Sequence, residues 1–573
     1  MKLVVWAPNA RTVDIVIDGH RTPMQRDSGE TWGADIDATL LGAGYRYSID
    51  SGAPLPDPRS RWQPEGVHGA SHVVATVLPR IAAAAPFRAP PLARAIIYEL
   101  HIGTFTREGT YAGAAQKLPH LVDLGVTHLE LMPLATFPGR HGWGYDGVDW
   151  YAPHPAYGSP QELADFVARC HACGLAVLLD VVYNHFGPDG NYWGQFGPYY
   201  TDRIKTPWGD AINYDGPLSD AVRGFVVDNA LMWLRDYGFD GLRLDAVHAI
   251  VCLEAVHILE ELAIAVDRLA AELGRPLVLI AESDANDPRL VRPRSAGGYQ
   301  LDAVWADDFH HSIHRFFTGE TNGYYADFKG LADIAMALRH GYVFQGQYSV
   351  FRRRHHGKAP LGIGPSQLVV CAQNHDQIGN RAGGERLSML LELPQLQAIA
   401  ALTVLAPFVP LLFQGEEWGA ETPFLYFTDH LDPELASAVA AGRRREFEAF
   451  GWQDTVPNPQ ELETFMRSKL DWSELTAPRH ALLYAWYRRL IRIRLEKRTA
   501  ASEAGSEVAF DAQAGWLTFH HAGVLAVFNF AELPQIVPKP AGPWVEAARS
   551  DPAQNPADCC LAAGATRIFT TGS

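Results

Sequence analysis

Short runs of alternating apolar and polar residues mark the first 90 positions of the chain. The runs VVWAP, TVDIVIDG, TWGADID and GYRYSID are separated by Gly, Pro, Asn and Asp. A period of two is typical of strands that bury one face, and short strands between turn residues favour a sandwich. We therefore expect residues 1–90 to form an N-terminal β-sandwich, with a Pro- and Ala-rich linker at 80–94.

Beyond this linker, strongly apolar runs alternate with segments of helical periodicity such as 219–238 and 393–406. The apolar runs lie at 95–105, 127–137, 175–185, 239–248, 276–284, 301–311, 367–376 and 408–417. Eight apolar strands, each followed by a helix or a long loop, are typical of a (β/α)8 barrel. The pattern predicts an α/β protein with a TIM barrel and loop insertions at 91–502.

A third pattern begins near residue 503, where the runs SEVAF, WLTFHH and VLAVFNF are separated by polar residues and Gly. Short apolar runs of this kind favour strands over helices. We expect a small C-terminal β domain at 503–573.

Composition limits the possible partners of this chain. It has 573 residues, of which 47% are hydrophobic and 20% charged, and 48 Lys and Arg stand against 65 Asp and Glu, for a net charge of −17. This balance is typical of a globular protein and disfavours nucleic acid or an anionic membrane as a partner. No apolar run is long enough to span a membrane, and the start does not resemble a secretory signal.

The six cysteines are sparse and irregularly spaced. Few cysteines favour a reducing compartment, so we expect a cytoplasmic location. Cys170 and Cys173 form a CxxC, but no second pair or spaced His pair accompanies it. We therefore interpret them as two cysteines on a packed helix, with no zinc site.

Four of the predicted strands end in dense polar clusters. The clusters are DVVYNH (180–185), RLDAVH (243–248), AES (281–283) and QNHDQIGNR (373–381). In a (β/α)8 barrel the carboxyl ends of the strands share one face, which carries the active site. A single Arg–Asp pair on a strand is usually a structural ion pair, but four clusters on one predicted face favour an active site.

Three carboxylates in these clusters suit the cleavage of a glycosidic bond. Arg243 and Asp245 are two apart on a predicted strand, so both side chains project to the same side, and the guanidinium favours an ionised carboxylate, as a nucleophile requires. Glu282 follows the apolar run PLVLIA, where burial would raise its pKa toward that of a general acid. Asp376 supplies a third carboxylate. Two carboxylates with separated pKa values are the minimum for this chemistry.

These four motifs resemble, in order, the signature regions of the α-amylase superfamily, the retaining α-glucan hydrolases and transferases of glycoside hydrolase family 13. The resemblance covers most of residues 95–500. It implies that Asp245 is the nucleophile, Glu282 the general acid/base, and Asp376 the carboxylate that holds substrate hydroxyls. An inactive, glucan-binding barrel is the alternative from another functional class, but it would be expected to lack at least one of these residues.

The resemblance also implies residues that contact the sugar. Arg243, His185 and His375 match family positions near the nucleophile or the reactive sugar, and His248 closes the same motif as Asp245. Tyr145 in HGWGYDG matches the family's stacking tyrosine. Asp180 is expected to support the loop of His185. Asn184 matches a position that binds calcium in many amylases, but the extra calcium loop is not recognisable, so we expect no metal and no cofactor.

Other stretches narrow the resemblance to one branch of the family. HGWGYDGV, QNHDQIGNR, LLFQGEEWG, TPFLYFTDH and GRRREF look like the branch that hydrolyses the α-1,4 bond next to the terminal trehalose of maltooligosyltrehalose, and the N-terminal segment resembles the family's glucan-associated sandwich. The closest alternative is a branching or debranching enzyme, but a branching enzyme would have an acidic residue where this chain has Gln377.

This branch implies a substrate, a pathway partner and further site residues. The substrate is maltooligosyltrehalose, and the partner is the synthase that makes its trehalose end. The candidates for sugar hydroxyls near that end are Asp307, Asp308, His310, His311, Gln377 and Asn380. The aromatic loop 191–200 either stacks on sugars or packs within the fold.

Overall fold

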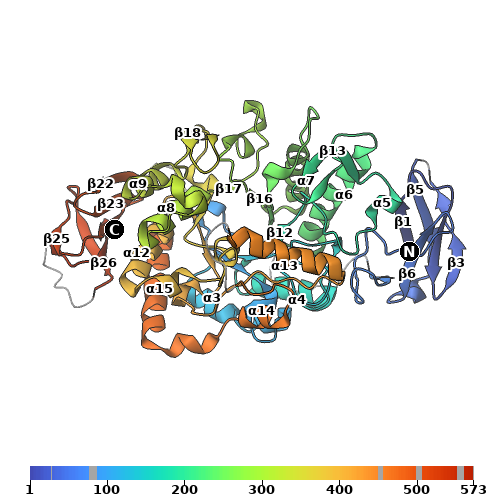
Figure 1. Ribbon diagram of the computed structural model, residues 1–573, viewed down its shortest axis with the longest axis horizontal. Coiled ribbons are helices and arrows are strands. Elements are labelled where there is room, and N and C mark those ends of the chain that lie inside the picture. Colours follow the sequence, from blue (N-terminus) through green and yellow to red (C-terminus); the bar gives the residue numbers. More distant parts are fainter. Residues whose placement is uncertain (28, 76–86, 449–455, 498–505, 552–559, 572–573) are drawn as a thin grey trace.

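Two small antiparallel sheets form the N-terminal end of the protein (Figure 1). The computed structural model describes residues 1–27, 29–75, 87–448, 456–497, 506–551 and 560–571. One sheet has the order β1 (Lys2–Trp6), β5 (Thr31–Asp35), β4 (Gln25–Arg26), and the other β3 (His20–Pro23), β2 (Val13–Ile17), β6 (Gly44–Ile49), β7 (Ser71–His72). The alternating runs therefore form strands, as predicted.

Two ion pairs join this N-terminal part to the barrel. Arg59 lies 2.9 Å from Asp228, and Arg61 lies 2.9 Å from Asp236. Both arginines also lie over aromatic rings, Arg59 over Tyr151 and Arg61 over Tyr237. The first part of the predicted linker, up to residue 86, lies outside the described residues, so the domain boundaries remain a prediction.

The centre of the molecule is a closed barrel of parallel strands, which confirms the predicted fold class. Its strands follow one another around the barrel in chain order and fall within the eight predicted apolar runs. They are β8 (Ile97–Leu100), β9 (His128–Leu131), β12 (Ala176–Val181), β15 (Gly241–Leu244), β16 (Val278–Ala281), β17 (Ala303–Trp305), β20 (Leu368–Cys371) and β21 (Val409–Phe413).

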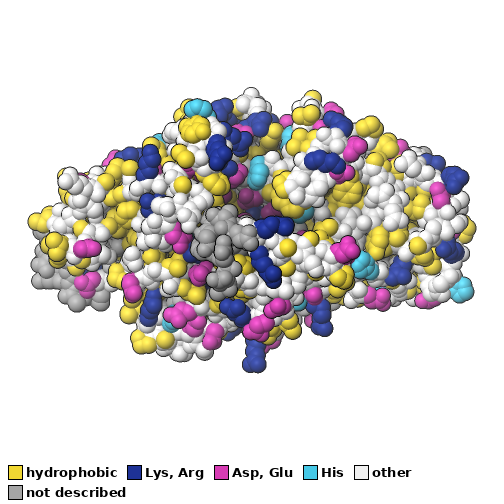
Figure 2. Space-filling view, viewed as in Figure 1, with side chains coloured by type: hydrophobic (Ala, Val, Ile, Leu, Met, Phe, Trp, Pro, Cys, Tyr) yellow, Lys and Arg dark blue, Asp and Glu magenta, His cyan; other side chains and the backbone are white. Residues whose placement is uncertain are grey.

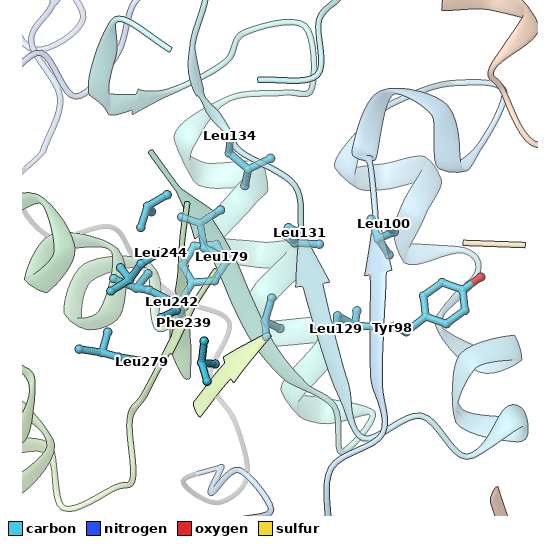
Figure 3. Packing of buried hydrophobic residues seen from close by; sticks show 14 of the residues in the cluster. Tyr98, Leu100, Leu129, Leu131, Leu134, Leu179, Phe239, Leu242, Leu244 and Leu279 are labelled. Atoms are coloured by element: carbon cyan, nitrogen blue, oxygen red, sulfur yellow. The ribbon is translucent and has the colours of Figure 1, made fainter. Parts of the chain in front are cut away.

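Side chains alternate between the outside and the inside of this barrel. The outward set packs with residues of the surrounding helices, and Figure 3 shows part of it, including Tyr98, Leu129 and Leu242. The inward set begins with an apolar cluster that includes Ile97 and Leu178. Because the strand period is two, the next inward residues on these strands are Glu99 and Asp180, and charge therefore replaces apolar packing toward the carboxyl ends.

Helices follow the strands of the barrel, as predicted, and one predicted strand needs a correction. They include α3 (Leu118–Leu124), α4 (Pro160–Ala172), α6 (Ser219–Met232), α7 (Ile258–Leu273), α12 (Leu393–Val404) and α15 (Pro478–Lys497). The run 301–311 was predicted as one strand, but β17 ends at Trp305 and α8 (Asp307–Thr318) begins at Asp307. Acidic residues favour the first turn of a helix because they complement its dipole, and this effect explains the early helix start.

The C-terminal end carries a further sheet, opposite the N-terminal sheets (Figure 1). Its order is β22 (Glu507–Asp511), β23 (Trp516–His521), β24 (Val524–Asn529), β28 (Thr566–Thr571), β26 (Trp544–Arg549). Arg489 of α15 donates to the carbonyl of Ala547 at 2.8 Å and so ties this sheet to the barrel. In the part of the chain that the structure describes, no helix is long and apolar enough to cross a membrane.

Candidate active site

Arg243 is the centre of the polar cluster at the carboxyl ends of the strands. Its side chain is fully buried, and its Nη1 donates to Asp180 Oδ2 at 2.7 Å and to Asp245 Oδ1 at 2.8 Å. Its Nη2 lies 3.6 Å from Glu282 Oε2, and the guanidinium lies 4.4 Å from the centre of the Trp305 ring. A buried cation needs such partners to offset the loss of water. The guanidinium thus joins carboxylates from three neighbouring strands or strand ends.

Asp245 is held from two sides. Arg243 binds its Oδ1, and Asn184 Nδ2 donates to its Oδ2 at 2.7 Å and to its backbone carbonyl at 2.8 Å. These bonds fix the orientation of both carboxylate oxygens while leaving 12% of the side chain exposed. An ionised, oriented and accessible carboxylate is what a nucleophile requires.

Glu282 has a different environment from that of Asp245, although it lies near the same Arg243 guanidinium. The backbone N–H of Ala246 donates to Glu282 Oε2 at 2.6 Å, and Ala246 adopts a left-handed conformation with φ 38° to make this bond. Burial raises the pKa of Glu282 well above its usual value; the Arg243 charge lowers it, whereas Asp245, Asp307 and Asp376 raise it further. Burial thus shifts the pKa of Glu282 in the direction expected from the sequence, and a raised pKa suits a general acid.

Asp376 lies on the short helix α10 (His375–Gly379), which follows β20. Asn374 caps this helix and accepts from the N–H of Asp376 at 2.9 Å, while Gln377 Oε1 accepts from the N–H of Asn374 at 2.9 Å. Asn380 donates to Asp376 Oδ1 at 3.4 Å. The carboxylate of Asp376 is 44% exposed and therefore remains open to a ligand. Gln377 serves the cap that positions it.

Two aromatic contacts border the carboxylates. Tyr145 stacks on His375 with ring centres 5.2 Å apart and donates from its hydroxyl to Asp180 Oδ2 at 2.6 Å. His185 bonds through Nδ1 to Asn184 and stacks on Trp208 at 4.5 Å. Trp208 lies between β13 (Tyr200–Thr206) and β14 (Gly209–Ile212) and is 48% exposed. Sequence reasoning missed Trp208, although an aromatic residue in the turn TPWGD was an available signal.

Asp284 is a second residue that sequence reasoning missed. It follows Glu282 by two positions, pairs with Arg352 at 2.8 Å and lies 4.0 Å from His248 Nδ1. Both Asp284 and His248 are more than a third exposed. His248 therefore lies at the rim of the cluster, beside this ion pair.

The candidates in α8 divide into two groups. Asp308 accepts from the N–H groups of Val343 and Phe344 at 2.8 Å each, and His310 bonds to the carbonyl of Ala372 at 2.5 Å, so both stabilise neighbouring loops. His311 is buried and its ring lies 4.4 Å from that of Tyr324. Asp307 differs because burial, with Asp284 and Asp376, raises its pKa to about 7. It is thus electrostatically linked to Glu282 and Asp376.

Replacing Asp307 with asparagine should move the alkaline limb of the kcat/KM profile to lower pH. Asp307 contributes to the raised pKa of Glu282, so without it Glu282 loses its proton at a lower pH, and we expect a shift of roughly half to one unit. The matched control is Asp302→Asn at the start of β17, where burial raises the carboxyl pKa to about 6. The limb should stay in place for that variant. An unmoved limb in Asp307→Asn would show that Asp307 does not influence Glu282.

In the space-filling view, acidic and histidine side chains gather in a hollow near the middle of the face shown (Figure 2). Among the described residues, no group of three or more His, Cys, Asp and Glu side chains is arranged to hold a metal ion. Asn184, which matched a calcium position, directs its amide to Asp245.

Comparison with known proteins gives a consistent set of relatives. The model of the family "Alpha amylase, catalytic domain" matches residues 78–205. The malto-oligosyltrehalose trehalohydrolase of Rhizobium sp. (strain M-11) is 50% identical over 549 residues, which cover 94% of this chain and 92% of that protein. A crystal structure from Salmonella typhimurium, described as an alpha amylase, is 35% identical, with a TM-score of 0.91, and the match covers 100% of this chain and 97% of that one. A 1,4-alpha-glucan branching enzyme of Xanthomonas campestris pv. campestris (strain 8004) is 28% identical over 73% of this chain and 60% of its own length.

Proposed function

The chain belongs to the malto-oligosyltrehalose trehalohydrolases of the α-amylase family, and we infer from its site which residues perform the hydrolysis. The enzyme cleaves the α-1,4-glucosidic bond next to the terminal trehalose of maltooligosyltrehalose and releases trehalose and a shorter maltodextrin. Of the features in the cluster, the one that best supports our assignment of roles is the shared guanidinium of Arg243, which contacts both Asp245 and Glu282.

We propose a double displacement with retention of configuration. Asp245 attacks the anomeric carbon of the glucosyl unit while Glu282 gives its proton to the oxygen that leaves with trehalose. The C–O bond to trehalose breaks and an ester to Asp245 forms. Glu282, now ionised, takes a proton from water, whose oxygen attacks the same carbon and releases the maltodextrin and the Asp245 carboxylate.

The neighbouring residues suit the roles of binding and orientation. Asp376 is the most exposed of the three carboxylates and is placed to accept bonds from sugar hydroxyls. Tyr145 bonds to Asp180 and to His375, and His185 bonds to Asn184. Asp180 and Asn184 connect these side chains to the nucleophile. Arg243 binds both Asp245 and Asp180 without contacting solvent, since its side chain is fully buried.

Selectivity for the trehalose end must come from hydroxyl contacts on the leaving side, because the bond cleaved is the same α-1,4 linkage in a plain maltodextrin. A site whose polar groups match one sugar leaves them unpaired with another, and such mismatches cost large factors in kcat/KM. We propose that Asp307 and Asn380, which neighbour Asp376, contribute directly to this match. Asp308, His310, His311 and Gln377 contribute by holding the surrounding backbone and rings.

The test compares maltotriosyltrehalose with maltopentaose. We expect trehalose and maltotriose from the first, and a kcat/KM at least about 100-fold lower for the second. The Asp245→Asn protein, purified in the same way, controls for contaminating enzymes. Equal specificity constants, or products with new α-1,6 branches, would contradict this function and favour a general amylase or a branching enzyme.

We also propose that this enzyme acts after a synthase that creates the trehalose end of its substrate. Hydrolysis next to a terminal trehalose requires a glucan whose reducing end has already been converted to the α,α-1,1 linkage. The support is chemical, and it calls for two enzymes in sequence rather than for a complex.

A further inference from the structure

Glu99 lies inside the barrel on β8 and contacts the active-site residue His375. Its Oε2 accepts from the backbone N–H of His375 at 3.1 Å, and its Oε1 lies 2.5 Å from His375 Nδ1. Both side chains are 1% exposed. A substrate in the cleft therefore cannot reach Glu99, although it can reach groups that His375 orients.

The hydrogen bonds around His375 fix the positions of its protons. Burial raises the pKa of Asp180 to about 6 while Arg243 opposes that rise, so Asp180 is ionised at neutral pH and can only accept from the hydroxyl of Tyr145. The Tyr145 oxygen, having donated its proton, must accept from His375 Nε2, which lies 2.8 Å away. Nδ1 must likewise donate to the Glu99 carboxylate. Both ring nitrogens carry protons, and His375 is a cation.

We propose that Glu99 is a positioning residue that keeps His375 cationic through the reaction, so that its Nε2–H fixes the hydroxyl of Tyr145 beside Asp180 and faces Asp376. This inference rests on the catalytic site proposed above. If His375 became neutral and kept its proton on Nδ1, Nε2 would become an acceptor. Tyr145 could then donate to His375 or to Asp180, but not to both.

Several charged groups face His375, and they shift its pKa in opposite directions. Burial lowers its pKa, but the carboxylates of Glu99 and Asp376 outweigh it and raise the pKa to about 9, while Arg243 lowers it. The other ionisable groups that face it are His101, Tyr145 and Glu130. Glu99 is the one carboxylate among them that bonds directly to the ring through Nδ1.

Glu130 offers a matched control on the neighbouring strand. It pairs in register with Glu99, and it is 1% exposed. Burial, with Glu99 and Asp180, raises its pKa well above the usual value. Within the described structure neither of its oxygens has a hydrogen-bond partner. Glutamine at 130 therefore breaks no hydrogen bond, whereas glutamine at 99 replaces the carboxyl group that bonds to the His375 ring.

The experiment measures kcat/KM for maltotriosyltrehalose against pH, and the ¹⁵N resonances of the His375 ring, assigned by their loss in His375→Gln. The wild-type pKa of His375 is about 9, and in Glu99→Gln we expect the ring to lose a proton at a pH at least about two units lower. The falling limb of kcat/KM should then begin at lower pH, with at least a tenfold loss at pH 8 that is largely recovered at pH 5. Glu130→Gln should keep the wild-type limb and the wild-type ring resonances.

Glu99→Asp keeps the charge one methylene farther away, and it should retain a cationic His375 even if kcat falls. The Glu99→Asp variant also tests the proposal if Glu99→Gln does not fold. A ring that stays doubly protonated at pH 8 in Glu99→Gln would overturn the proposal, as would equal limb shifts in Glu99→Gln and Glu130→Gln, or a neutral ring in Glu99→Asp. If the wild type failed to cleave maltotriosyltrehalose, the proposed function would fail, while the ring resonances would still decide the role of Glu99.

Discussion

Asp245→Asn should lower kcat for maltotriosyltrehalose by at least about 10⁴-fold. An amide is too weak a nucleophile to form the glucosyl ester. Asparagine nearly preserves the volume of the side chain, and its oxygen can still accept from Arg243. The fold should therefore persist, and a melting temperature close to that of the wild type would show it. Steady-state turnover of the purified variant is the primary measurement.

Chemical rescue distinguishes the loss of the nucleophile from the loss of an ion pair. In Asp245→Ala, azide can enter from the side that the carboxylate occupied and convert maltotriosyltrehalose to trehalose and β-maltotriosyl azide, with inverted configuration. Asp180→Asn removes the other carboxylate on the same Nη1 atom, and azide should not restore that variant. Turnover of Asp245→Asn within tenfold of the wild type, or an azide product of α configuration, would contradict the role of Asp245.

Glu282→Gln should lower kcat for the same substrate by about 10² to 10⁴-fold, because the amide cannot protonate the leaving oxygen of trehalose. The loss should depend on the leaving group. Fluoride leaves with little protonation, so α-maltotriosyl fluoride should still glucosylate Asp245. Azide, which needs no general base, should then release α-maltotriosyl azide. Rates for the two substrates, with and without azide, are the measurement.

The alkaline limb of the pH profile gives an independent readout for this variant. In the wild type, activity should fall as Glu282 loses its proton, and burial moves that fall to higher pH because it raises the pKa of Glu282. Glutamine does not titrate, so the fall that belongs to Glu282 should disappear from the residual activity, and any fall that remains should be that of His375. Equal losses on the glycoside and the fluoride, with an unchanged limb, would mean that another group donates the proton.

The barrel and the pair at its centre were predictable from sequence because they depend on local periodicity. Buried parallel strands are continuously apolar, and each predicted run contains one strand of the closed barrel. Residues two apart on a strand face the same way, so the sequence alone predicts that Arg243 lies beside Asp245. The apolar run before Glu282 predicted its raised pKa for the same local reason.

Contacts that join distant parts of the chain were not predictable in this way. Glu99 and His375 are 276 residues apart in the sequence. On β8 the glutamate is one polar residue in an apolar run, and this local pattern does not predict which distant residue it contacts. Trp208 reaches His185 because a hairpin folds over the cluster, and Arg352 reaches Asp284 from another hairpin. Asp307 and Asp308 follow an apolar run, and this pattern predicts that they end a strand. They begin a helix instead, because acidic residues favour the first turn of a helix.

The backbone at Ala246 has a consequence for how this enzyme can evolve. The left-handed conformation that aims its N–H at Glu282 costs an L-residue on the order of 1 kcal/mol, and glycine would remove that cost. Glycine would also lose more entropy on folding, by roughly 0.5 to 1 kcal/mol. Because the two effects nearly cancel, selection for stability has little influence on this position. A methyl group at 246 instead narrows the range of backbone geometries, and therefore the spread of positions that the general acid samples between one turnover and the next.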